Sequence, residues 1–173
     1  MTTEEHHAAF SRWLDEHAAV LHHVANGFAA GADRQDLMQE LLLAMWRAIP
    51  AFRAGAKPST FIFKVAHNTA LTWKRTQRNY AQRIDRFEVL AGREMFFATG
   101  ISDREHETLE ALYACIRELP PLDRSLVVLH LDGASYAEIG EIHGLKEGNV
   151  GARLSRLKQK LSSTMQEITH ELR

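Results

Sequence analysis

Apolar side chains recur every three or four residues along most of this chain, and this spacing limits its fold more than any other feature. Between residues 6 and 29 they stand at Phe10, Leu14, Leu21, Val24 and Phe28, which is the period of a helix with one buried face. There is no sustained alternation of apolar and polar residues between turn signals, as half-buried strands would require. The sequence therefore predicts an all-α protein.

Glycine, proline and capping residues divide this pattern into separate helices. Ser59 or Thr60 can cap a helix that runs to about residue 79, and its inner face would hold Ile62, Ala66, Thr69 and Trp73. The other helices are expected at about 6–29, 33–49, 104–119, 121–131, 136–143 and 146–173. In the helix that precedes the two prolines, one face would hold Leu109, Leu112, Ile116 and Leu119.

The helical pattern weakens between residues 80 and 105, which separates two groups of helices. We therefore expect two small helical domains, over 1–80 and 107–173, joined by a linker over 81–106.

Basic side chains are concentrated in two separate segments of the chain. The net charge is only −1, but residues 57–93 hold eight basic and two acidic side chains, and residues 146–160 hold five and one. Two basic segments in an otherwise acidic chain favour contact with a polyanion.

The stretch 136–155 has the spacing of a helix-turn-helix that reads DNA. Gly140 stands at its fifth position, Gly144 at its ninth and Val150 at its fifteenth, so that two helices can cross closely. The outer stripe of its second helix is Asn149, Arg153, Arg156 and Lys160. Asparagine and arginine pair with base edges, and lysine and arginine contact phosphates, so we predict that this stripe binds duplex DNA. The competing interpretation is a helical hairpin that binds nothing.

A second stripe, on the helix after residue 58, is basic and includes an amide. Its members are Lys64, Asn68, Leu71, Arg75 and Arg78. The preceding loop holds Phe52, Lys57 and Ser59. A basic groove beside an aromatic-bearing loop suits single-stranded DNA, which needs charge for phosphates and a platform or pocket for bases.

On the helix over 33–49, a further stripe points away from the apolar face: Asp36, Glu40, Leu43 and Arg47.

Together these segments resemble a known family. The runs 33–40, 46–48 and 59–71 resemble region 2 of the extracytoplasmic-function (ECF) sigma factors of the sigma-70 family, and the runs 119–124, 135–140 and 147–156 resemble their region 4. The two sets occur in the family's order with a linker between them. The pair is highly specific, although neither motif is unique alone.

The resemblance implies partners and roles. Region 2 would dock on the β′ clamp helices of core RNA polymerase through Asp36, Gln39, Glu40, Leu43 and Arg47. It would melt the minus-ten element, with a base captured by the loop 52–59 and the strand held by Lys64, Asn68, Arg75 and Arg78. Region 4 would read the minus-thirty-five element and contact the β flap. The family also implies regulation by an anti-sigma factor.

The sequence departs from the family pattern at three positions. Gly151 stands where Lys or Arg is frequent, Thr72 where Asp is common, and Gln35 where Glu is frequent. Glycine inside a helix costs about 1 kcal/mol relative to alanine, and here it also removes an expected phosphate contact. These departures affect which promoter sequence we would expect.

Other classes of function find little support. There is no glycine-rich phosphate loop, nucleophile motif or flanked carboxylate pair, so we expect neither an enzyme nor a bound cofactor. His17, His22 and His23 lack companions for a four-ligand metal site, and the lone Cys115 is expected in the core. No apolar run is long enough to span a membrane and no secretory signal stands at the start, so we expect a cytoplasmic protein.

The main alternative is a helix-turn-helix regulator whose N-terminal half senses a ligand or dimerises. Such a regulator would bind duplex DNA tightly by itself, whereas a sigma factor acquires its specificity on joining core polymerase. A helical interaction protein that sequesters a partner is a second alternative, and a metal-dependent helical hydrolase is a distant third.

Overall fold

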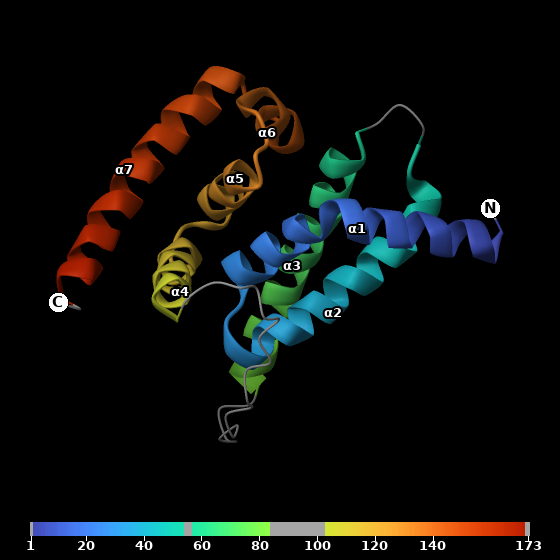
Figure 1. The fold of residues 1–173 in the computed structure, drawn as a ribbon, viewed down its shortest axis with the longest axis horizontal. Coiled ribbons are helices and arrows are strands. Elements are labelled where there is room, and N and C mark those ends of the chain that lie inside the picture. The colour runs from blue at the N-terminus through green and yellow to red at the C-terminus, as the bar shows by residue number, and fades with distance from the viewer. Residues whose placement is uncertain (1, 54–56, 84–102, 172–173) are drawn as a thin grey trace. The chain divides into compact units, whose positions relative to one another are not determined.

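The structure is a computed structural model that describes residues 2–53, 57–83 and 103–171 (Figure 1). Within these ranges the chain forms seven α-helices and one short 3-10 helix, and it contains no strand. The predicted all-α class is confirmed. The chain divides into two compact units, Met1–Arg93 and Glu94–Arg173, and each is described by itself.

The first unit packs three long helices against one another. These are α1 (Thr3–Phe28), α2 (Gly31–Ala48) and α3 (Pro58–Arg83), with the short helix η1 (Ile49–Ala51) after α2. The apolar residues at helical spacing along α2 are buried, namely Leu37, Leu41 and Met45, and so is Ile49 at the start of η1. A capping box formed by Thr2 and Glu5 begins α1. The apolar period of each helix is therefore directed into one shared core.

Helix α3 begins at Pro58, earlier than a cap at Ser59 or Thr60 would allow. The backbone N–H of Phe61 donates to the carbonyl oxygen of Lys57 over 3.1 Å, and Pro58 occupies the first helical position. Proline suits this position because its φ is already helical and its missing N–H would have no partner there. Ser59 and Thr60 thus lie inside the first turn, and the expectation that one of them caps the helix was wrong.

The buried face of α3 also differs from the expected one. Phe63, His67 and Ala70 are buried with the predicted Ile62 and Ala66. The other two predicted members, Thr69 and Trp73, are half-exposed. Since α3 contacts both α1 and α2, its buried face is wider than a single stripe and is turned toward both neighbours. His67 fills part of this face against the rings of Phe28 and Phe63.

The second unit contains four helices, of which the last contacts the other three. They are α4 (Asp103–Arg117), α5 (Pro121–Leu131), α6 (Tyr136–His143) and α7 (Glu147–Glu171). The apolar residues at helical spacing along α7 are all buried: Val150, Leu154, Leu157 and Leu161. Pro121 begins α5, as expected. Helix α7 is therefore the central element of this unit.

Helix α4 is rotated slightly from its predicted orientation. Tyr113 and Ile116 are buried, whereas Leu109 is 38% exposed and Cys115 is only half-buried, with a free thiol. The expectation of a core position for Leu109 and Cys115 was wrong, because the buried face follows the residues that meet α5 and α7.

The end of α4 is closed by a buried arginine. Arg124 donates from Nη2 to the carbonyl oxygens of Arg117 and Leu119, the second over 3.0 Å. These carbonyls belong to a helix end, where no intrahelical partner is present. Burial lowers the pKa of Arg124 below its usual value. The side chain thus fixes the angle between α4 and α5.

The predicted linker 81–106 lies largely outside the described residues, so its bounds and those of the two domains stay a prediction. Helix α3 extends to Arg83 and α4 begins at Asp103. In the part of the chain that the structure describes, no helix is long and apolar enough to cross a membrane.

Candidate nucleic-acid interface

The turn between α6 and α7 has the predicted helix-turn-helix geometry. A capping box begins α6: Ser135 Oγ accepts from the N–H of Glu138 over 3.2 Å, and the Glu138 carboxylate accepts from the N–H of Ser135 over 2.9 Å. Gly144 ends α6 in the left-handed region, with φ of +68°. The N–H of Leu145 then donates to the carbonyl oxygen of Gly140 over 2.9 Å. This closed end is the αL cap that glycine permits.

Gly140 is required by the close approach of the chain after the turn. A Cβ atom at this position would lie 2.5 Å from the carbonyl oxygen of Leu145. The obstructing atom belongs to the backbone, so no side-chain rearrangement can relieve the contact. Val150 is fully buried on the facing side of α7. The small residue and the apolar residue therefore have the roles that their spacing predicts.

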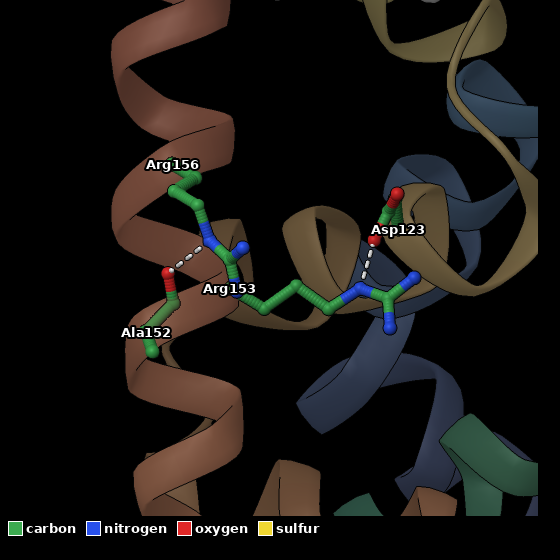
Figure 2. A network of polar contacts seen from close by, with 4 residues as sticks. All are labelled: Asp123, Ala152, Arg153 and Arg156. Carbon is green, nitrogen blue, oxygen red and sulfur yellow. Dashed lines mark hydrogen bonds and ion pairs between the residues drawn. The ribbon is translucent and has the colours of Figure 1, made fainter.

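The predicted DNA-reading stripe on α7 is not uniform. Asn149, Arg156 and Lys160 are exposed, whereas Arg153 is half-buried. Figure 2 shows the Arg153 side chain reaching from α7 to α5, where its Nε donates to Oδ1 of Asp123. The Arg156 side chain instead folds back on its own helix, and its Nε donates to the carbonyl oxygen of Ala152 over 3.2 Å.

Three residues at this surface were missed by the sequence analysis. Ala152 and Ser155 are exposed on the same side of α7 as Asn149 and Arg156, and the helical period alone would have found them. Asp123 precedes Arg153 by 30 residues and lies on another helix. No local pattern signals that contact.

Gly151, which departs from the family pattern, lies against the ring of Tyr136. A Cβ atom at this position would be 3.4 Å from Cδ2 and Cε2 of that ring. A Cβ atom would thus lie in van der Waals contact with the ring, so Tyr136 of α6 lies close to the backbone of α7 at this point. The other departures lie elsewhere: Thr72 is exposed on α3 and Gln35 is half-buried on α2.

His130 lies at the end of α5, with its ring 5.8 Å from that of Tyr136. Burial lowers the pKa of His130, and the positive charge of Lys158 on α7 lowers it further. The imidazole is therefore neutral near pH 7. A neutral ring does not repel Lys158, so α5 can lie against this basic helix.

The stripe on α3 that is predicted to bind the unpaired DNA strand has polar residues exposed to solvent. Lys64, Asn68 and Arg75 are exposed and Leu71 is half-exposed, while the side chain of Arg78 is outside the described residues. Because Lys64, Asn68 and Arg75 are spaced four and seven residues apart, they lie along one side of the helix. They offer two charges and one amide on a continuous surface.

Phe52, the first residue of the predicted base-capturing loop, packs against other aromatic rings of its unit. Its ring lies 5.3 Å from that of Trp13 and 5.3 Å from that of Phe61, both in edge-on arrangements. Such pairs stabilise the fold, so Phe52 anchors the loop to α1 and α3. Lys57 is exposed and Ser59 is half-buried, while residues 54–56 are outside the described ranges.

The five α2 side chains predicted to dock on polymerase share one exposed surface. We call them the α2 stripe: Asp36, Gln39, Glu40, Leu43 and Arg47. Leu43 is 41% exposed, which makes it one of the few large apolar side chains on the surface of the described residues. Trp46 beside the stripe is covered by α1, because His6 stacks on it at 4.0 Å and Phe10 meets it edge-on at 5.2 Å.

A metal site has no support in the described residues, where no three His, Cys, Asp or Glu side chains gather closely enough to hold an ion. The surfaces above are instead charged or amide-bearing and face solvent. They are suited to binding an extended, negatively charged polymer and a protein partner.

Comparison with known proteins agrees with this arrangement. Residues 10–80 match the Sigma-70 region 2 family, and residues 109–161 match the family described as Sigma-70, region 4. The chain is 27% identical over 153 residues to the ECF RNA polymerase sigma-E factor of Escherichia coli strain K12. The matched region covers 82% of this chain and 78% of that protein. It is 25% identical over 147 residues to the ECF RNA polymerase sigma-E factor of Haemophilus influenzae, covering 79% and 76%.

Two solved structures share the fold. The sigma factor RpoE from Bartonella quintana, solved in complex with the anti-sigma factor NepR, superposes with a TM-score of 0.66 at 21% identity, covering 91% of this chain and 97% of that one. CnrH, solved in complex with the cytosolic domain of CnrY, superposes with a TM-score of 0.62 at 19% identity, covering 93% and 90%. With both regions matched in the family's order and the helix-turn-helix geometry in place, this chain belongs to the sigma-70 family as an extracytoplasmic-function sigma factor.

Proposed function

We propose that this protein binds core RNA polymerase and directs promoter-specific initiation by recognising and melting promoter DNA. The observation that carries the proposal is the α6–α7 turn. Its close crossing at Gly140 presents Asn149, Arg156 and Lys160 to solvent on one helix. An exposed helix of this kind fits the major groove, where amide and guanidinium groups distinguish base pairs.

The first unit supplies the functions that a DNA-binding module alone lacks. The α2 stripe combines acidic, basic and apolar side chains, which suits a protein partner, and we assign it to the β′ clamp helices. The stripe on α3 (Lys64, Asn68, Leu71, Arg75 and Arg78) and the loop 52–59 are assigned to the unpaired minus-ten strand. The second unit is assigned to the minus-thirty-five element and to the β flap.

Regulation by a bound protein follows from the relatives. RpoE and CnrH were each solved with a protein partner, NepR and the cytosolic domain of CnrY. We extend this to the present chain, for which an anti-sigma factor is the expected regulator. The protein would act in the cytoplasm with the polymerase, and we assign it no catalytic activity or cofactor of its own.

Transcription with purified core polymerase tests this proposal. Templates carrying a randomised promoter region are transcribed with core polymerase alone, with the chain alone, and with both. We expect defined run-off products only when both are present, and enrichment of one two-part promoter. A free chain that binds one duplex sequence tightly, together with unchanged transcription, would instead establish the ligand-sensing or dimeric regulator.

A further inference from the structure

We propose that Arg153 positions the recognition helix α7 instead of reading a base, and that Asp123 is its partner in this role. The proposal rests on the DNA-binding function assigned above. It separates Arg153 from the other three members of the stripe that the sequence grouped together, Asn149, Arg156 and Lys160.

The first argument is the environment of the pair. Asp123 is the more buried partner, with its side chain 15% exposed against 40% for Arg153. Asp123 also lies in the first turn of α5, where the helix N-terminus favours a negative charge. If Arg153 turned toward DNA, this carboxylate would lose its hydrogen-bonded partner while remaining mostly buried, which is strongly unfavourable.

The second argument is the place of Arg153 on the helix. It is half-buried, and its neighbours about one helical turn before and after it, Val150 and Leu157, are both buried, so it occupies the inner flank of α7. The fully exposed side of this segment holds Asn149, Ala152, Ser155 and Arg156. A helix lying in the major groove would present that exposed side to the base edges.

The third argument is that α7 is held from two different helices. On one flank Tyr136 of α6 lies against Gly151, and on the other Asp123 of α5 holds Arg153 (Figure 2). Two such contacts fix the rotation of α7 about its own axis. Specific contacts need side chains placed within about 0.5 Å and 10–20° of their productive geometry, so a small rotation would weaken every base contact together.

The test uses the full chain assembled with core polymerase, on duplexes selected by the unaltered holoenzyme from a library randomised across the upstream element. The variants are Asp123→Asn, Arg153→Ala, the double variant that combines them, and the exchange Asp123→Arg with Arg153→Asp. Glu110→Gln is the matched control, because it removes a carboxylate–guanidinium pair of the same kind, the 2.8 Å ion pair between Glu110 and Arg117 within α4.

If Arg153 is a positioning residue, each single variant weakens binding to the selected duplex by roughly five- to tenfold, and the double variant is no weaker than either single one. The base preference falls evenly across the positions instead of at one of them, and the salt dependence stays that of the unaltered protein. The charge exchange restores part of the affinity. Thermal unfolding of Asp123→Asn and of the double variant stays close to that of Glu110→Gln, because neither leaves a buried carboxylate unpaired, so their loss concerns DNA contact and not folding. Arg153→Ala unfolds at a lower temperature, because Asp123 stays mostly buried without its partner.

A different result assigns base or phosphate contact to Arg153. In that case Arg153→Ala alone flattens the preference at one base position or reduces the salt slope by about one, and Asp123→Asn leaves the affinity equal or higher. That pattern would overturn the inference while the proposed function stands. If the unaltered holoenzyme selects no sequence, the proposed function itself fails.

Discussion

Single side chains decide what the α6–α7 surface can recognise. Arg156 and Lys160 are both exposed on α7, yet they offer different chemistry. The guanidinium group is planar and can bond two acceptors of one guanine, whereas the ammonium group is a compact, strongly hydrated charge. At the residue scale, therefore, the two basic residues of one stripe have separable roles.

Replacing each in the full chain should show this difference. With the holoenzyme, Arg156→Ala should lose about 1–3 kcal/mol on the selected duplex and flatten the preference at one base position. Lys160→Ala should weaken all sequences alike and reduce the salt slope by about one. Binding to selected and scrambled duplexes at several salt concentrations measures both. Gln166→Ala, exposed further along α7, serves as the control.

If Arg156→Ala leaves both affinities and the base preference unchanged, α7 does not read the upstream element through this residue. Equal effects of Arg156→Ala and Lys160→Ala on every sequence would mean that both contact phosphate alone. The specificity would then have to come from Asn149 or from the shape of the DNA.

Helix α2 has two separate faces, one packed in the core of its unit and one proposed to bind polymerase. Its residues Leu37, Leu41 and Met45 are buried in the unit's own core, while the α2 stripe faces solvent. Because the two faces are separate, the stripe can be altered without removing any core contact. The contribution of α2 to polymerase binding can therefore be measured apart from its contribution to folding.

Substitution of Asp36→Arg together with Glu40→Arg should abolish binding to core polymerase. Truncation of a central interface residue commonly costs about 2 kcal/mol or more, and reversing two charges adds repulsion. Helix content by circular dichroism should not change. The control is Asp15→Arg with Glu16→Arg, which makes the same charge change at exposed positions of α1. Normal polymerase affinity in the α2 variant would contradict the docking assignment.

At the scale of the whole molecule, the proposed function needs both units, because it assigns duplex DNA to one and a single strand to the other. A melted strand is favoured only if it is bound more tightly than the paired one. In the proposal, the exposed Lys64 and Arg75 would supply charge for that strand, and Asn68 between them would supply hydrogen-bonding groups. Substitutions in this stripe of α3 should therefore reduce opening of the promoter duplex and leave the initial closed complex with polymerase intact.

We expect Asn68→Ala to leave the closed complex with polymerase nearly intact and to reduce the open complex strongly. Contacts to a captured or stacked base contribute about 1–3 kcal/mol each. Filter binding measures the closed complex, and permanganate reactivity of unpaired thymines measures the open one. The control is Thr76→Ala, which removes an exposed hydroxyl that donates to the carbonyl oxygen of Thr72 over 3.0 Å within α3.

Should both complexes fall together in the Asn68→Ala protein, or neither fall, α3 is not the melting site. The N-terminal half would then be better interpreted as the sensing or dimerisation half of a regulator.

The helical class and the helix-turn-helix could be predicted before any coordinates because their signals are local. The period of apolar residues marks each buried face, and Gly140, Gly144 and Val150 are all within eleven residues of one another. A helix cap or a tight crossing depends on neighbours of this kind. The capping box between Ser135 and Glu138, three residues apart, depends on the same local rules.

Contacts between distant parts of the chain could not be predicted in this way. Nothing near Arg153 indicates that Asp123 holds it, and nothing near Phe52 indicates that Trp13 fixes its ring. The wider buried face of α3 likewise depends on packing against two helices at once. Periodicity shows which side of a helix is apolar, but the partner of a side chain depends on how helices cross, and only the packed structure determines that crossing.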